Sequence, residues 1–207
     1  MVKAMFDDVE FRQRNQLTAV NSINWARVMA QTVYYVTASE MFDKPVTFSV
    51  PTGNFGNVLA GWIARKMGEP IRDFIISSNT NDILTRFINS NDMSARAVIP
   101  SLSPSMDIQV SSNFERLLFE MNDRDGGMTA EQMRRFRATG NLTIEADQRA
   151  AFLSGSIRAA AFDDEHTLAE IKRIYDVTGG YVVEPHTATA TAAARMLSAN
   201  DEGGPVI

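Results

Sequence analysis

Apolar positions along the chain alternate between helix-like and strand-like spacing. Residues 22–41 carry apolar side chains three and four positions apart, as on one broad face of a helix. An apolar run at 46–50 is followed, after a loop, by a helix-like pattern at 58–67 that ends at Gly68, and then by a second apolar run at 73–78. Strand, helix and strand within about thirty residues predict a βαβ unit with parallel strands and a right-handed crossover.

Beyond residue 90 the pattern is mainly helical, and turn residues separate the helices. A short strand is predicted at 181–183, and residues 203–207 have the pattern of a turn followed by the start of another buried strand. The predicted helices are 113–121, 129–138, 146–154, 164–176 and Pro185 to Leu197. The predicted turns are 125–127 and 139–141.

This order of elements predicts an α/β fold with a parallel-sheet βαβ core. Residues 1–92 are expected to form part of the α/β domain, residues 93–178 a helical insertion, and residues 179–207 a return to the α/β domain. Because the chain begins and ends abruptly within the pattern, we expect this fold to be incomplete at both ends.

Composition excludes several classes of function. With 44% hydrophobic residues, 22% charged residues and a formal net charge of -5, the chain has no basic cluster that would bind nucleic acid. No apolar run is long enough to span a membrane, so we expect a cytoplasmic protein without a membrane partner. There is no cysteine, and His166 and His186 are the only histidines, which makes a metal site improbable.

The loop at 51–57 carries the candidate chemistry. Gly53 and Gly56 allow the backbone to turn sharply and approach a ligand, while Asn54 and Asn57 tolerate left-handed φ angles. The N–H groups at the start of the following helix can then bind a phosphate. An ordinary tight βα turn is the alternative, since the same residue types favour it. The glycine spacing of a dinucleotide fold and the lysine of a Walker loop are both missing.

Five segments, in this order and at this spacing, resemble the threonine synthase family, in particular its longer bacterial and yeast type. Together they extend over nearly all 207 residues. They are Asn21-Ser22-Ile23-Asn24-Trp25-Ala26-Arg27, residues 50–57, Ser78-Asn79-Thr80-Asn81-Asp82, residues 105–116 and Pro185-His186-Thr187-Ala188.

The resemblance implies a pyridoxal 5′-phosphate enzyme with the fold of the tryptophan synthase β family. The implied reaction is the last step of threonine biosynthesis, in which O-phosphohomoserine and water give threonine and phosphate and the cofactor acts as electron sink. In that family the cofactor's 5′-phosphate is held by the segment that matches Gly53, Asn54, Phe55, Gly56 and Asn57.

Such a reaction also needs an anion site for the substrate's phosphate. Ser22, Asn24 and Arg27 form one candidate group, because Asn24 and Arg27 are three residues apart on one helix face. Asn79 and Asn81 form a second, at the carboxyl end of a predicted strand. The alternatives are a solvated helix arginine for Arg27 and helix capping by Asn81 or its neighbour.

The resemblance further implies a lysine that forms a Schiff base with the cofactor. None of the four lysines, Lys3, Lys44, Lys66 and Lys172, stands in a suitable context. We therefore expect an internal piece of a threonine synthase that is inactive alone, and we assign no catalytic residue. His186 is expected to begin a helix that Thr187 caps.

Two other functions remain open at this stage. One is a non-catalytic phosphate-binding or interaction module derived from the same fold, and the other is a related pyridoxal lyase such as threonine dehydratase. In either case, strands missing at the sheet edges and an uncovered apolar face at 22–41 predict self-association.

Overall fold

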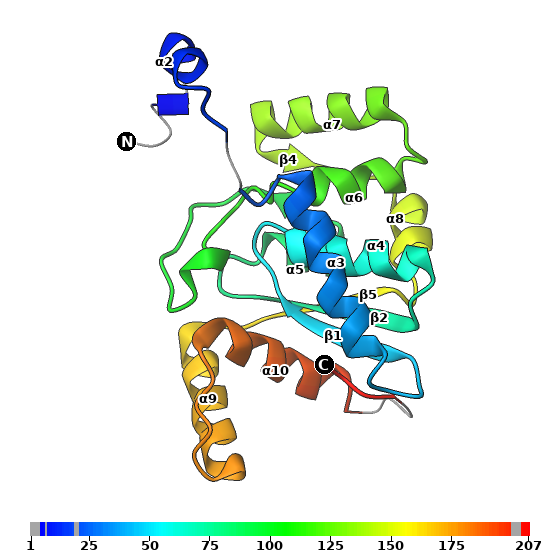
Figure 1. Cartoon of the computed structure of the whole chain (residues 1–207), viewed down its shortest axis with the longest axis vertical. Coiled ribbons are helices and arrows are strands. Elements are labelled where there is room, and N and C mark those ends of the chain that lie inside the picture. Colours follow the sequence, from blue (N-terminus) through cyan, green and yellow to red (C-terminus); the bar gives the residue numbers. More distant parts are fainter. Residues whose placement is uncertain (1–4, 7, 19–20, 200–203) are drawn as a thin grey trace.

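The main sheet contains three parallel strands. A computed structural model describes residues 5–6, 8–18, 21–199 and 204–207. The strands are arranged in the order β1 (Val46–Pro51), β2 (Ile71–Ser78) and β5 (Ile157–Ala161), and α4 (Gly56–Met67) connects β1 to β2 (Figure 1). The predicted α/β fold and its βαβ unit are therefore confirmed.

Helices cover both faces of this sheet. The alternation of side chains along β2 sends Phe74 and Ile76 into the larger core, which includes Leu59 of α4, whereas Ile75 packs with Ala193 of α10 on the opposite face. Figure 1 shows α3 and α4 on one side of the strands and α9 and α10 on the other. The helices are α2 (Val9–Arg14), α3 (Trp25–Ser39), α5 (Ile83–Ser90), α6 (Phe114–Met121), α7 (Gly126–Thr139), α8 (Ala146–Leu153), α9 (Asp164–Thr178) and α10 (Pro185–Leu197), and a 3-10 turn spans Pro104–Met106.

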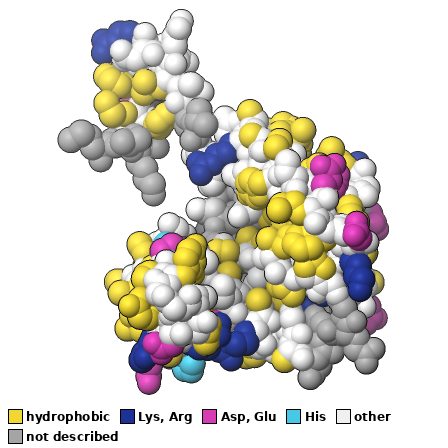
Figure 2. All heavy atoms as spheres, turned by 60° about the horizontal axis from the view of Figure 1, so that its bottom comes forward, with side chains coloured by type: hydrophobic (Ala, Val, Ile, Leu, Met, Phe, Trp, Pro, Cys, Tyr) yellow, Lys and Arg dark blue, Asp and Glu magenta, His cyan; other side chains and the backbone are white. Residues whose placement is uncertain are grey.

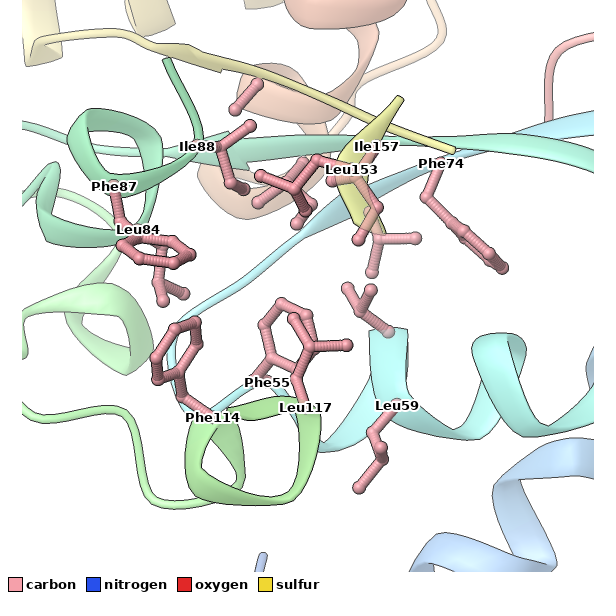
Figure 3. Packing of buried hydrophobic residues seen from close by; sticks show 14 of the residues in the cluster. Phe55, Leu59, Phe74, Leu84, Phe87, Ile88, Phe114, Leu117, Leu153 and Ile157 are labelled. Atoms are coloured by element: carbon pink, nitrogen blue, oxygen red, sulfur yellow. The ribbon is translucent and has the colours of Figure 1, made fainter. Parts of the chain in front are cut away.

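The middle of the chain packs on the same core. The inward face of α6 is fully buried, and its Phe114 ring lies edge-on to Phe55 and Phe87, at centroid distances of 6.2 and 4.9 Å (Figure 3). A second, two-stranded antiparallel sheet pairs β3 (Met93–Ser94) with β4 (Asn141–Leu142). Its inward residues, Phe114, Leu117, Leu118 and Met121, follow helical spacing and are all buried.

Some predicted elements differ from the structure. Strand β5 was not expected, although it pairs with β2 in the main sheet and lies within the segment 93–178. The predicted strand at 181–183 is absent, because those residues form no ladder. The predicted turn at 125–127 is the start of α7, where the Asp125 side chain accepts a hydrogen bond from the Met128 N–H. The division of the chain into three segments stays a prediction.

The chain end lies beside β1. The Thr47 N–H donates to the Pro205 carbonyl at 3.0 Å, and the Ile207 N–H donates to the Thr47 carbonyl at 2.9 Å. This parallel pairing agrees with the predicted strand start, but Val206 and Ile207 are partly exposed rather than buried. The glycine at 203 of the predicted turn lies outside the described residues.

Helix α3 buries a narrower face than its apolar pattern predicts. Its buried positions are Val28, Thr32, Tyr35 and Ser39. The expected face was broader, and Val33, for example, is 60% exposed. The short helix α2 buries nothing and lies apart from the body of the molecule (Figures 1 and 2). Several apolar residues of the predicted helix 22–41 are exposed, namely Ile23, which lies before the start of α3, and Met29, Val33 and Tyr34 within it.

Candidate functional site

A cavity of about 430 Å³ lies at the carboxyl end of β1. It is bounded by the loop between β1 and α4, by α3 with the residues before it, and by Ser105. The lining includes the predicted cofactor loop and two of the predicted substrate residues, Ser22 and Arg27. The lining residues are Ser22, Arg27, Gln31, Tyr34, Pro51, Thr52, Gly53, Asn54, Phe55, Gly56, Asn57 and Ser105.

The backbone of the loop presents the start of α4 to this cavity. No side chain caps the helix, and its first internal hydrogen bond runs from the Leu59 N–H to the Phe55 carbonyl. The N–H groups of the first turn therefore have no partner in the helix itself, which is the arrangement that binds anions.

Phe55 takes the left-handed conformation, with φ of 60°. We expected Asn54 and Asn57 to supply this geometry, and that expectation is wrong. A bulky residue at positive φ is strained. The strain is held because the Phe55 ring is only 1% exposed and packs edge-on against Phe114.

The two glycines of the loop make room for the protein's own atoms. A Cβ on Gly53 would collide with the carbonyl oxygen of Ser105. A Cβ on Gly56 would lie 3.3 Å from Nδ2 of Asn113 and 3.4 Å from the carbonyl oxygen of Ser22. The sequence predicted close approach at both glycines, and the group that approaches is polypeptide.

Side chains of residues 111–113 donate hydrogen bonds to the loop between β1 and α4. The Ser111 hydroxyl donates to the Gly53 carbonyl at 2.9 Å. The Asn113 side-chain amide donates to the carbonyls of Asn54, at 3.0 Å, and Ser22, at 2.8 Å. Three of the five segments that resemble the threonine synthase family therefore meet around the cavity: 21–27, 50–57 and 105–116.

Helix α3 supplies the opposite wall. Tyr34 and Tyr35 donate their hydroxyl protons to Oδ1 of Asn57, at 2.8 and 2.6 Å. Burial raises the pKa of Tyr34 to about 12, with a smaller opposing effect from Arg27, so this phenol stays protonated at neutral pH. The oxygen of Asn57 is thus occupied as an acceptor, and its NH₂ group retains two protons to donate.

Gln31 and Tyr34 were not predicted as site residues. They follow Arg27 by four and seven positions, so the three residues lie on one face of α3. That spacing was a usable signal once Arg27 was chosen. Asn24, in contrast, does not line the cavity: it is the N-cap of α3, and its side chain accepts hydrogen bonds from the N–H groups of Ala26 and Arg27.

Asn79 and Asn81 also lie outside the cavity lining. They are 1% and 3% exposed, and their side-chain amides both donate to Oδ1 of Asp107, at 2.7 and 3.0 Å. Asn81 in addition donates to the carbonyl of Ile99 at 2.8 Å. The structure therefore gives these two residues partners within the protein, and their role in substrate binding stays a prediction.

His186, Lys66 and Lys172 have partners within the protein. His186 lies in the first turn of α10, as predicted, but the N-cap is Glu184 rather than Thr187. Lys66 lies over the Trp62 ring and pairs with Glu120, and Lys172 pairs with Asp176. None of Lys44, Lys66 and Lys172 lines the cavity, and Lys3 lies outside the described residues.

Two further features are absent from the described part of the chain. Its side chains include no group of three or more His, Asp or Glu residues placed to hold a metal ion. Nor does that part contain a helix with the length and apolar character needed to cross a bilayer.

Comparison with known proteins identifies the relatives of the chain. No family model matches it. The threonine synthase of Pseudomonas aeruginosa is 48% identical over 198 residues, which are 94% of the chain, and that of Saccharomyces cerevisiae is 39% identical over 97% of the chain. The chain is a homologue of threonine synthases. It spans 42% of the length of each of these two relatives.

Solved structures agree with this relationship. The pyridoxal-phosphate-bound threonine synthase of Brucella melitensis superposes with a TM-score of 0.91 and 42% identity, over 99% of the chain and 44% of that structure. The yeast threonine synthase structure gives a TM-score of 0.90 and 36% identity over the same shares. Maize serine racemase, with a TM-score of 0.60 and 11% identity, shares the fold alone. The α/β fold of this homologue is therefore that of the threonine synthases.

Proposed function

We propose that this chain is the part of a threonine synthase that holds the phosphate of pyridoxal 5′-phosphate. The observation that carries the proposal is the uncapped start of α4 at a cavity of about 430 Å³. A phosphate group there would accept hydrogen bonds from the N–H groups that follow Phe55 and would be stabilised by the helix dipole. The cavity size is in the range of small-molecule sites. Gly53, Asn54, Phe55, Gly56 and Asn57 are the proposed cofactor-binding residues.

The proposed reaction of the whole protein converts O-phosphohomoserine and water to threonine and phosphate. Pyridoxal phosphate, when bound, supplies an electron sink for this chemistry. The chain's own contribution is to bind anions: Arg27 and the Ser22 hydroxyl line the same cavity as the loop and are proposed to hold the substrate's phosphate. Asn24 would act indirectly, by capping the helix that carries Arg27.

We propose no turnover by these 207 residues alone. The reaction requires a lysine amine near the cofactor, and none of the three described lysines reaches the cavity. The chain is proposed to bind the cofactor's phosphate without forming a covalent bond to it. Borohydride reduction of a mixture with pyridoxal phosphate tests this point, because a covalent adduct on any lysine would refute it.

A charge change at Asn57 tests the phosphate site. Asn57→Asp keeps an oxygen that can accept hydrogen bonds from Tyr34 and Tyr35. It also places a negative charge beside the proposed phosphate site. We expect the affinity for pyridoxal phosphate, measured by calorimetry, to fall by about tenfold or more. Asn141→Asp, an exposed change outside the cavity lining, is the matched control.

The outcomes of this test are decisive in both directions. No binding by the unaltered chain, or equal affinity in Asn57→Asp and the unaltered chain, would reject the phosphate site. The phosphate-binding module remains the second candidate function, since none of the described lysines lines the cavity. Threonine synthase activity in a protein that joins this chain to the parts of a relative outside the matched 42% would decide for the enzyme.

Cytoplasmic location and self-association are further proposals. The exposed apolar residues of α3, among them Val33, support self-association. Sedimentation velocity tests it, and a monomer at all concentrations would reject it.

A further inference from the structure

His186 connects α10 to the wall of the cavity. Its Nδ1 lies 2.6 Å from Oε2 of Glu184, and its Nε2 accepts a hydrogen bond from the backbone N–H of Ser105 at 3.3 Å. Its side chain is 24% exposed. Ser105 is one of the residues that line the cavity.

The carboxylate of Glu184 determines which ring nitrogen of His186 accepts. Burial raises the pKa of Glu184, but hydrogen bonds from His186 and Thr187 outweigh it and lower the pKa to about 2, so the group is a carboxylate at neutral pH. A carboxylate can only accept, and Nδ1 must therefore carry the proton of the neutral ring. Nε2 is left with a lone pair directed at the Ser105 N–H.

Ser105 lies between His186 and the loop. Its N–H is bound by the imidazole, and its carbonyl lies against Gly53, where no Cβ would fit. Two acidic groups on neighbouring segments have other partners. Asp107 accepts a hydrogen bond from Asn79, and Asp164 of α9 accepts one from the Leu102 N–H.

We propose that His186 is a positioning residue for the anion site. The hydrogen bond from Ser105 to its Nε2 fixes the peptide that packs on Gly53, and thereby keeps the cavity open at the size its ligand needs. The part that concerns the ligand rests on the proposed function, whereas the positioning of Ser105 does not. Of the residues that line the cavity, Ser105 is the one whose N–H donates to His186.

Two substitutions separate the two nitrogens of the ring. In His186→Gln the side-chain oxygen can take the place of Nε2 and accept from Ser105, whereas in His186→Asn the shorter side chain can reach only the place of Nδ1. Hydrogen exchange of the Ser105 amide, followed by NMR in the unliganded chain, measures the positioning directly. We expect exchange to be about five- to tenfold faster in His186→Asn and close to that of the unaltered chain in His186→Gln.

Affinity for pyridoxal phosphate is the second readout. It should follow the same order, with a loss of about fivefold in His186→Asn and recovery in His186→Gln. A helix-start role alone predicts equal effects of the two substitutions on Ser105 exchange, and that result would overturn the proposal. Fast exchange in His186→Asn with unchanged affinity would overturn its ligand part. Failure of the unaltered chain to bind the cofactor would instead reject the proposed function, while the exchange result would still stand.

Discussion

After β1 the chain passes through Gly53 and Asn54 into α4, and after β2 it passes through Asn79 and Asn81 into α5. Both loops lie at the carboxyl edge of neighbouring parallel strands. Neither helix start has a side-chain cap, but the first one borders a cavity, whereas the asparagines of the second loop are buried and hydrogen-bonded.

The difference comes from what a distant segment brings to each loop. Residues 101–107 place the Asp107 carboxylate on Asn79 and Asn81, so the side-chain amides there are satisfied within the protein. Toward the first loop, the same segment presents the backbone of Ser105 and Met106, which packs on Gly53. An asparagine that follows a parallel strand therefore indicates a ligand site only where the fold leaves its side-chain amide without a hydrogen-bond partner in the protein.

Removing Asp107 should have the largest effect. Asp107→Ala deletes the acceptor shared by Asn79, Asn81 and Ser101 and leaves buried amides with fewer partners. We expect a loss of about 3–5 kcal/mol in the free energy of unfolding, measured with urea. The control is Asp176→Ala, an exposed partner of Lys172, which should cost less than about 1 kcal/mol. A loss from Asp107→Ala as small as that of the control would show that the hydrogen bonds of Asp107 do not account for the difference between the two loops.

The two glycines of the first loop should respond unequally to alanine. Gly53→Ala forces a Cβ against the Ser105 backbone, and we expect a cost of about 2–3 kcal/mol in unfolding free energy. Gly56→Ala meets the side-chain amide of Asn113 and the carbonyl of Ser22 at 3.3–3.4 Å, and should cost about 1 kcal/mol or less. Thermal or urea unfolding of both variants measures the pair. The reverse order would mean that the Ser105 segment is not packed on Gly53 as described.

A smaller effect is expected from acid. The pKa of Glu184 falls from its ordinary 4.5 to about 2 in the folded chain. The stability that this shift contributes is therefore complete above about pH 5 and is lost as the pH falls toward 2. In Glu184→Gln, the drop in unfolding free energy between pH 5 and pH 3 should be smaller than in the unaltered chain. Equal drops in the two proteins would show that Glu184 does not carry this dependence.

Local patterns predicted the elements whose signals are close together in sequence. The bounds of α10 and the inward face of α6 follow from helical spacing, and the β1–α4 loop follows from its glycines. Strand β5 has the sequence Ile157-Arg158-Ala159-Ala160-Ala161, whose alanines are poor strand formers. This segment is a strand because it pairs with β2, and the residues next to it in sequence do not indicate that pairing.

The site was predicted in part for the same reason. Ser22, Arg27 and the loop share the cavity, as their motifs indicated. The partners of Asn79 and Asn81 could not be predicted, because Asp107 is 26 or more positions away in sequence. The position of Ser105 against His186 is likewise a contact across 81 positions.

The left-handed backbone of Phe55 has a thermodynamic consequence for any ligand of the cavity. Its buried ring holds the turn in shape through contacts within the protein, so a binding anion does not have to order the loop. Binding then costs the loop little conformational entropy, and little affinity is lost for that reason. The entropy of association should accordingly be dominated by released water and counterions, with only a minor contribution from the polypeptide.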